Sequence, residues 1–231
     1  MKPTMLKSEP CPSAPRRTAV FGVFLLGLLA SQAVPAAELA LWYDKPAARW
    51  EQEALPIGNG RLAAMIFGGM QKERLQFNEE SLWIGDETDT GAYQAFGDIL
   101  VDFAHADGTD YRRELDIARG VHAVTYTSGG VRYRREYFAS HPAQVVVLRF
   151  TADKPGSLTG SVVLADMHEG RVAAEKNQLS SAGSLQGYSY KEGSATRESP
   201  PQPYAIALQY EAQVAVVNDG GSIEIADGKI A

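Results

Sequence analysis

Residues 121–138 read VHAVTYTSGGVRYRREYF. Apolar and polar side chains alternate over residues 121–127 and again over residues 131–138, and both runs are rich in Val, Thr and Tyr. Such alternation is typical of strands that are buried on one face only. The Ser-Gly-Gly sequence at 128–130 separates the runs and is a tight-turn signal. The stretch therefore predicts an antiparallel β-hairpin.

Similar strand-like runs lie on both sides of this hairpin, separated by Gly-rich turns. They occupy residues 74–78, 98–103, 157–164, 204–217 and 222–225. Only residues 47–54 suggest a helical turn. Strands at this spacing favour a sandwich over a parallel α/β sheet. We therefore expect an all-β fold, a multi-stranded antiparallel β-sandwich (a supersandwich) that occupies residues 37–231 as one domain.

Three local patterns give finer expectations. Residues 144–151 are almost continuously apolar, which predicts a strand buried on both faces. Asp107 and Gly108 predict a second hairpin, joining the run that ends at Phe103 to residues 111–117. Residues 183–203 are rich in Ser, Gly, Pro and charge, which predicts a long surface loop.

The N-terminus has the layout of a secretory signal peptide. Four basic residues lie within the first 17, and the uncharged apolar run 18–30 follows them. Val34, Pro35 and Ala36 then form a small-x-small cleavage site. The run is shorter than the roughly 20 residues that span a bilayer, so we expect residues 1–36 to be cleaved, although an uncleaved membrane anchor is the alternative. This predicts a periplasmic or secreted product that has no membrane contact after cleavage.

Charge and cysteine content narrow the functional class. Cleavage after Ala36 changes the net charge from −6 to −9 and removes Cys11, the only cysteine. No basic stripe interrupts this acidic surface, so nucleic-acid binding is excluded. The four histidines are isolated in the sequence, which predicts ordinary surface or turn histidines, no metal site and no cofactor. Carboxylates are the usual catalytic groups of glycoside hydrolysis, but adjacent Glu79 and Glu80 on a strand would point to opposite faces.

A long ordered motif precedes the hairpin. It comprises LWYDKPA (41–47), Trp50, EALPIGNGRLAAMIFGG (53–69) and LQFNEESLW (75–83), and YQAFGD (93–98), YRRELD (111–116) and REYFASHP (135–142) follow it. The series resembles the N-terminal domain of family 95 glycoside hydrolases, the α-L-fucosidases that also include α-L-galactosidases. The resemblance covers about residues 39–161.

The resemblance implies a β-sandwich followed by an (α/α)6 barrel that carries the catalytic acid and base of an inverting mechanism. Residues 1–231 contain no counterpart of the barrel or its catalytic motifs, so no catalytic residue is predicted in this chain. The resemblance also implies that the last strands of the sandwich come from sequence beyond Ala231. The implied partners are a fucosylated or galactosylated glycan, as substrate of the full enzyme, and the missing barrel.

Two groups of residues are candidates for a barrel-facing or substrate-proximal role. Asn59 and Arg61 either lie on a loop that shapes the barrel pocket, or form a turn between core strands with Arg61 stacked on Trp42 or Trp50. Asn78, Glu79 and Trp83 either meet the barrel, or form a capped strand end with a core tryptophan.

Three functional hypotheses remain open on the sequence. The first is the N-terminal sandwich of an α-L-fucosidase, inactive by itself. The second is a stand-alone carbohydrate-binding module that uses exposed aromatic residues. The third is a non-functional fragment with an unpaired edge near residues 204–225.

Overall fold

Among the residues that the structure describes, almost every element is a β-strand, and all the strand pairs are antiparallel. The computed structural model describes residues 39–87, 90–191, 194–197 and 208–231. Within these ranges the only helix is α1 (Trp50–Glu53), a single turn inside the expected segment 47–54. The expected signal peptide 1–36 and parts of the expected loop 183–203 and strand 204–217 lie outside the described residues. The all-β expectation is confirmed.

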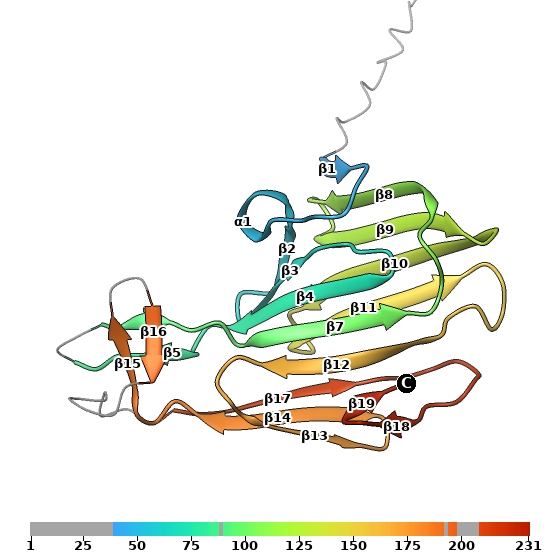
Figure 1. Ribbon diagram of the computed structural model, residues 1–231. Helices are drawn as coiled ribbons and strands as arrows, with labels where there is room; N and C mark the ends of the chain where they lie inside the picture. The colour runs from blue at the N-terminus through green and yellow to red at the C-terminus, as the bar shows by residue number, and fades with distance from the viewer. Residues whose placement is uncertain (1–38, 88–89, 192–193, 198–207) are drawn as a thin grey trace, which may run out of the picture. The chain divides into compact units, whose positions relative to one another are not determined.

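One layer is a five-stranded sheet that contains the expected hairpin. Its order is β1 (Ala40–Tyr43), β8 (Thr109–Asp116), β9 (Val121–Ser128), β10 (Val131–Ser140) and β11 (Val145–Ala152) (Figure 1). Val131 pairs with Ser128 at the hairpin end. Gly129 and Gly130 have φ of 56° and 72°, the positive values that a two-residue turn of this twist requires.

The facing layer is a seven-stranded sheet. Its order is β18 (Ile225–Ala226), β19 (Lys229–Ile230), β12 (Gly160–Asp166), β7 (Gly97–Phe103), β4 (Lys72–Glu79), β3 (Leu62–Ile66) and β2 (Leu55–Gly58). The expected strands 74–78, 98–103 and 157–164 correspond to β4, β7 and β12. A chain with consecutive strands in two facing sheets closes its core without helices.

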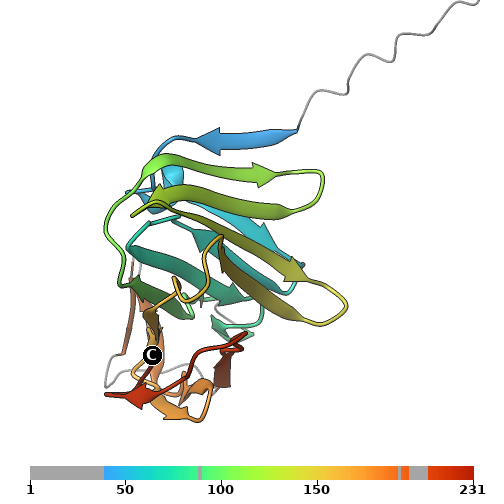
Figure 2. The ribbon, with the colours of Figure 1, turned by 90° about the vertical axis from the view of Figure 1, so that its right-hand side faces the viewer.

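Three smaller sheets complete the described residues. One contains β13 (Arg171–Glu175), β14 (Gln178–Ser184) and β17 (Gln209–Ala215), and the two-stranded sheets pair β15 (Tyr188–Lys191) with β16 (Ser194–Arg197) and β5 (Trp83–Ile84) with β6 (Ala92–Tyr93). In both views, β1 and the three-stranded sheet lie at opposite ends of the fold (Figure 1 and Figure 2).

The main core lies between the two large sheets. Ile66 and Leu75 from the seven-stranded sheet and Val124 and Tyr137 from the five-stranded sheet have exposed fractions of 0%. The alternating burial of β9 shows why: every second side chain from His122 to Ser128 points inward. Burying each such aliphatic side chain stabilises the fold by roughly 1.5–3 kcal/mol.

A second, smaller core joins β5 and β6 to the C-terminal strands. Its buried members are Leu82, Ile84, Phe96, Leu185, Tyr188 and Tyr210. The Phe96 ring packs edge-on against Tyr210, with 5.2 Å between their centroids. This cluster holds the β5–β6 hairpin against the body of the domain.

Two local expectations are wrong, and a third, the long loop at residues 183–203, is wrong in its described part, which contains the end of β14 and the paired strands β15 and β16. Asp107 and Gly108 do not form a hairpin, because β7 belongs to the seven-stranded sheet and β8 to the five-stranded sheet, so the connection crosses between layers. The apolar run 144–151 forms β11, but this strand is the edge of its sheet, and none of its residues is fully buried. Its Val145 has an exposed fraction of 43%. The prediction failed because an apolar run does not reveal whether its strand lies at the centre or at the edge of a sheet.

Candidate functional site

Asn59 organises the turn between β2 and β3. Its Oδ1 accepts hydrogen bonds from the backbone N–H groups of Arg61 (3.0 Å) and Leu62 (2.7 Å). Its Nδ2 donates to the carbonyl of Ser140 (2.9 Å), at the end of β10 in the other sheet. An Asn side chain carries both a donor and an acceptor, so it can close the turn and tie it to the facing layer at once. The expected turn is confirmed.

Arg61 extends from this turn to the end of β4. Its Nε lies 2.8 Å from Oε1 of Glu79, and its carbonyl accepts a hydrogen bond from the Glu80 N–H (3.0 Å). The expected stacking of Arg61 on Trp42 or Trp50 is not what the structure shows. Trp42 is instead in contact with Arg112, whose guanidinium carbon lies 4.7 Å from the ring centroid. The sequence could not separate these partners, because Trp42 lies in the five-stranded sheet and Glu79 in the other.

Glu79 has a partner on each carboxylate oxygen. Oε1 accepts from Arg61, while Oε2 accepts from the Ser81 N–H (2.8 Å) and the Ser81 hydroxyl (2.6 Å). Burial by itself would raise the pKa of Glu79, but the hydrogen bonds from Ser81 and Arg61 outweigh it and hold the pKa below its ordinary value. A general acid must be protonated near the working pH, so Glu79 is unsuited to that role.

Asn78 is joined to this group only through the backbone of its neighbour Glu79. Its Oδ1 accepts from the N–H of Glu79 (2.9 Å), its own neighbour, and it pairs in register with Ala63 on β3. Core residues Phe77 and Leu75 alternate with it along β4, so Asn78 lies on the face of the sheet that is turned away from the main core.

Trp83 forms an exposed aromatic pair with Tyr93. The two residues are register partners on β5 and β6, and their ring centroids are 5.7 Å apart. Their exposed fractions are 45% and 46%, so Trp83 is not the core tryptophan of the second alternative. The indole N–H donates to the carbonyl of Thr90, and the Tyr93 hydroxyl donates to the carbonyl of Glu79 (3.0 Å).

The candidate site is therefore a braced turn beside an aromatic surface. Asn59, Arg61 and Glu79 are joined by direct contacts, and Trp83 joins them through Tyr93. Tyr93 was missed in the sequence, although it begins the YQAFGD motif and could have been found as the partner of Trp83. The arrangement can hold a loop in place and present aromatic rings to a partner. Both oxygens of its carboxylate, that of Glu79, already accept hydrogen bonds from Arg61 and Ser81.

The buried charged residues Arg135 and Glu73 hold the two sheets of the sandwich together, and they were not singled out from the sequence. Arg135 donates to the carbonyls of Gly69 (2.5 Å) and Met70, and its guanidinium lies 3.9 Å from the centroid of Phe103. Glu73 accepts from the Tyr137 hydroxyl (2.6 Å). The signal was present, because Arg135 belongs to the REYFASHP motif.

Arg113 plays the same part at the other end of the core. With an exposed fraction of 0%, it donates to the carbonyls of Lys45 (2.8 Å) and Glu53 (2.6 Å) and lies 4.1 Å from the centroid of Tyr43. β8 thus holds the segment before α1 and the last residue of α1. Arg113 of the YRRELD motif therefore has a structural role.

Two of the four histidines are buried: His122 lies inside a strand, contrary to expectation, whereas His168 lies in the turn between β12 and β13. His122 has an exposed fraction of 0% and stacks on Tyr137, with 5.4 Å between centroids. His168 is 8% exposed, and its Nε2 lies 2.8 Å from the carbonyl of Ala95. His122 occupies an inward position of β9, where alternation alone would have placed an apolar residue.

The described part of the chain has neither a cluster of metal-ligand side chains nor a long apolar helix. There, no three His, Cys, Asp or Glu side chains are grouped so that they could hold a metal ion. The described ranges also contain no helix of the length and apolarity needed to cross a bilayer.

Comparison with known proteins gives one family and several relatives. Residues 41–91 and 86–231 match the family described as "Glycosyl hydrolase family 65, N-terminal domain". Over 237 residues the chain is 30% identical to "Alpha-L-fucosidase 2" of Arabidopsis thaliana, covering 83% of this chain and 28% of that protein. It is 29% identical to "Probable alpha-fucosidase A" of Aspergillus oryzae, covering 49% of this chain, and 27% identical to the protein of that name from Aspergillus niger, covering 54%.

The matched relatives are much longer than the matched region. The chain spans 28%, 22% and 21% of their respective lengths.

Proposed function

Because this chain belongs to the family of glycosyl hydrolase family 65 N-terminal domains, we propose that it is the N-terminal β-sandwich of an inverting α-L-fucosidase of the family 95 type. Such an enzyme releases terminal fucose from glycans. The relatives named as α-fucosidases support the substrate, and the ordered motif 41–83 supports the family 95 assignment over other glycoside hydrolases. The substrate of the full enzyme would be a fucosylated or galactosylated glycan.

The domain's part in this reaction is structural rather than catalytic. The observation that carries this is the state of Glu79, the carboxylate at the centre of the candidate site. Both its oxygens are occupied by Arg61 and Ser81, and its pKa is held low. Glycoside hydrolysis needs one carboxyl that is free to give a proton and a second that activates water or attacks. We assign both to the barrel, outside residues 1–231.

The candidate residues would brace the surface that meets this barrel. Trp83 and Tyr93 present exposed rings, and Arg61 lies beside them with 55% of its side chain exposed. Aromatic residues and arginine are enriched where protein surfaces meet. Asn59, Arg61 and Glu79 would fix the loop, Trp83 would supply the contact, and Asn78 would lie on the adjoining sheet face.

The direct test is an activity assay of the purified chain. On aryl α-L-fucoside and aryl α-L-galactoside we expect no turnover above the uncatalysed rate. A turnover that persists through purification and is lost in Glu79→Gln would place the chemistry in this domain and overturn the proposal. Sequencing the coding DNA downstream of codon 231 gives the complementary check: an open frame that encodes a helical barrel is expected.

Export is part of the same proposal. Residues 1–36 would be removed by a signal peptidase during transport to the periplasm or the medium. Intact-mass measurement of the exported protein should give a chain that begins at Ala37; a chain that retains residues 18–30 would show an uncleaved anchor instead.

A further inference from the structure

The five-stranded sheet has an outer face, turned away from the main core, on which charges of opposite sign alternate. We define this outer face by the exposed or partly exposed residues Trp42, Asp110, Arg112, Glu114, Ala123, Thr125, Thr127, Arg132, Arg134, Glu136 and Arg149.

Strand register arranges these residues in rows across the sheet. Trp42 pairs with Glu114, which pairs with Ala123, and Glu136 and Arg149 continue that row.

The next row contains arginine and threonine. Arg112 pairs with Thr125, and Thr125 pairs with Arg134. A row with guanidinium donors therefore lies beside a row with carboxylate acceptors.

Ion pairs between the rows and within one of them hold the long side chains in place. Arg112 lies 2.5 Å from Glu114, and Glu136 lies 2.8 Å from Arg134 and 3.4 Å from Arg149. Each such exposed pair adds little stability. Its effect on recognition is larger, because the polar groups are oriented before a ligand arrives.

Two adjoining hollows are cut into this face. Each has a volume of about 240 Å³, and Thr125 and Arg134 line both. Each hollow by itself is smaller than the roughly 300–1,000 Å³ that is typical of small-molecule sites, so a ligand would have to extend over both.

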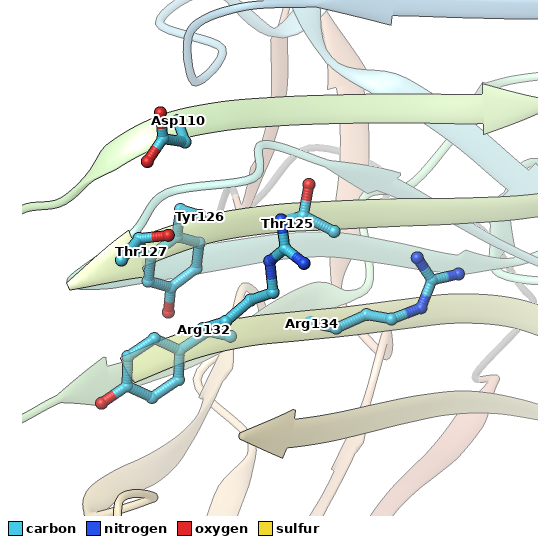
Figure 3. Close-up of a pocket in the computed structure, with 7 residues that line it drawn as sticks. Asp110, Thr125, Tyr126, Thr127, Arg132 and Arg134 are labelled. Carbon is cyan, nitrogen blue, oxygen red and sulfur yellow. The ribbon is translucent and has the colours of Figure 1, made fainter. Parts of the chain in front are cut away.

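An irregularity of the sheet shapes the first hollow. The register of β8 and β9 shifts between Thr109 and Arg112, and Asp110 has φ of 55°. Figure 3 shows Arg132 of β10 reaching toward Thr125 on β9, with Asp110 on the strand beyond. Bulges of this kind re-aim side chains at binding sites.

An aromatic ring borders the second hollow. Trp42 has an exposed fraction of 57% and contacts Arg112, which lines the hollow together with Glu114.

The balance of charge points to the ligand. The outer face carries four arginines (Arg112, Arg132, Arg134 and Arg149) and three carboxylates (Asp110, Glu114 and Glu136), so it offers no large surplus of positive charge to an anion. Arg112 is paired with Glu114, and Arg134 and Arg149 share Glu136. Sugar hydroxyls both donate and accept hydrogen bonds, which matches alternating guanidinium, carboxylate and threonine groups. The apolar face of a sugar ring packs well against an exposed indole.

We propose that the outer face of the five-stranded sheet binds a neutral oligosaccharide. One sugar ring packs on Trp42, and the next lies over Thr125, with its hydroxyls bonded to Arg134 and Arg132. This site is separate from the Trp83–Tyr93 surface. It depends only on residues of the outer face, so it does not require the proposed fucosidase activity.

Titration calorimetry of the purified chain with 2′-fucosyllactose tests the proposal. We expect saturable binding, weakened about tenfold by Trp42→Ala, as the loss of one aromatic contact predicts. Trp50→Ala and Trp83→Ala are matched controls, because these tryptophans are 46% and 45% exposed and lie off this face; both should bind like the parent chain.

A second variant guards against misfolding. Thr125→Val removes a hydroxyl from both hollows with little change of shape, and it should weaken binding while leaving the urea unfolding midpoint unchanged. The proposal is overturned by absence of binding in the parent chain, by loss of binding in Trp83→Ala with retention in Trp42→Ala, or by tighter binding of acidic oligogalacturonate than of 2′-fucosyllactose.

Discussion

Glu73 and Arg135 form an ion pair across the sandwich, with 3.5 Å between Oε2 and Nη1 and an exposed fraction of 1% for each residue. Glu73 lies on β4 and Arg135 on β10, so the pair joins the two large sheets. Each group has further partners: Glu73 accepts from the Gly68 N–H (2.8 Å), and Arg135 donates to the Gly69 carbonyl (2.5 Å). The pair thus fixes the β3–β4 connection and the relative position of the layers.

Arg135→Met should strongly destabilise the domain. It leaves the Glu73 carboxylate buried without its cation, and breaking one side of a buried pair costs about 3–5 kcal/mol. Urea unfolding measures the effect. Arg134→Met on the same strand is the control: its side chain is 49% exposed, so we expect a loss below about 1 kcal/mol. Equal losses in the two variants would contradict a clamp by Arg135.

Adding Glu73→Gln to Arg135→Met should recover part of this loss. The double variant no longer buries a lone charge, so the two changes should be coupled by about 1–3 kcal/mol. Strict additivity of the two single variants would show that the two side chains do not act as a pair.

Gly68→Ala should destabilise the domain more than Gly60→Ala. Both positions have positive φ, +75° and +94°, so both variants carry similar backbone strain of about 1 kcal/mol or more. At Gly68 a Cβ would also come within 2.6 Å of the Tyr111 hydroxyl, whereas nothing lies within 4 Å at Gly60. The difference between their urea midpoints isolates the crowding; equal midpoints would mean that Tyr111 moves away freely.

The free energy of unfolding should decrease as the pH falls below 6.5, and His122 should be a main cause. Burial, together with the charge of Arg113, lowers the pKa of His122 from 6.5 to about 3. Between these two pKa values, His122 is protonated in the unfolded chain but not in the folded chain. The free energy of unfolding therefore decreases by up to about 1.4 kcal/mol for each unit by which the pH falls.

Variants can separate His122 from the carboxylates. Glu79 and Asp166 also have lowered pKa values, but the stabilisation that these carboxylates contribute is lost only as the pH falls below their ordinary pKa values of 4.5 and 3.8. Thermal melts between pH 6.5 and 4.5 should therefore depend less on pH in His122→Leu, and should be unaffected by His141→Leu, which alters an exposed ring. An unchanged slope in His122→Leu would refute the assignment.

Asn59→Asp and Asn59→Ala separate the two tasks of this side chain. Aspartate keeps the acceptor for Arg61 and Leu62 but loses the donor to Ser140, so we expect a loss of about 1 kcal/mol. Alanine loses all three bonds and should cost about twice as much, by urea unfolding. If the two variants were equally stable, the turn-closing bonds would contribute nothing.

Much of the fold could be predicted, because strand formation depends on local alternation. The hairpin of β9 and β10 follows from residues 121–138 alone, and β4, β7 and β12 lie where alternation places them. The assignment of strands to sheets could not be predicted in this way. Asp107 and Gly108 have the same local chemistry whether the chain folds back or crosses to the other layer.

The candidate site shows the same division. Asn59 was recognisable as a turn residue, and its bonds to Arg61 and Leu62 are local. Its bond to Ser140 spans 81 positions, and the partner of Arg61 turned out to be Glu79 rather than a tryptophan. Spacing carries no information about such partners.

By itself, the sequence determined that this is an all-β domain with Gly-rich turns and a motif series typical of a glycoside hydrolase N-terminal domain, because alternation and backbone freedom are properties of neighbouring residues. The tertiary structure alone decided that His122 is buried, that Trp83 is exposed, and that Arg61 meets Glu79. These outcomes depend on which surfaces the two sheets turn toward each other, and that is settled by the packing of side chains distant in the chain.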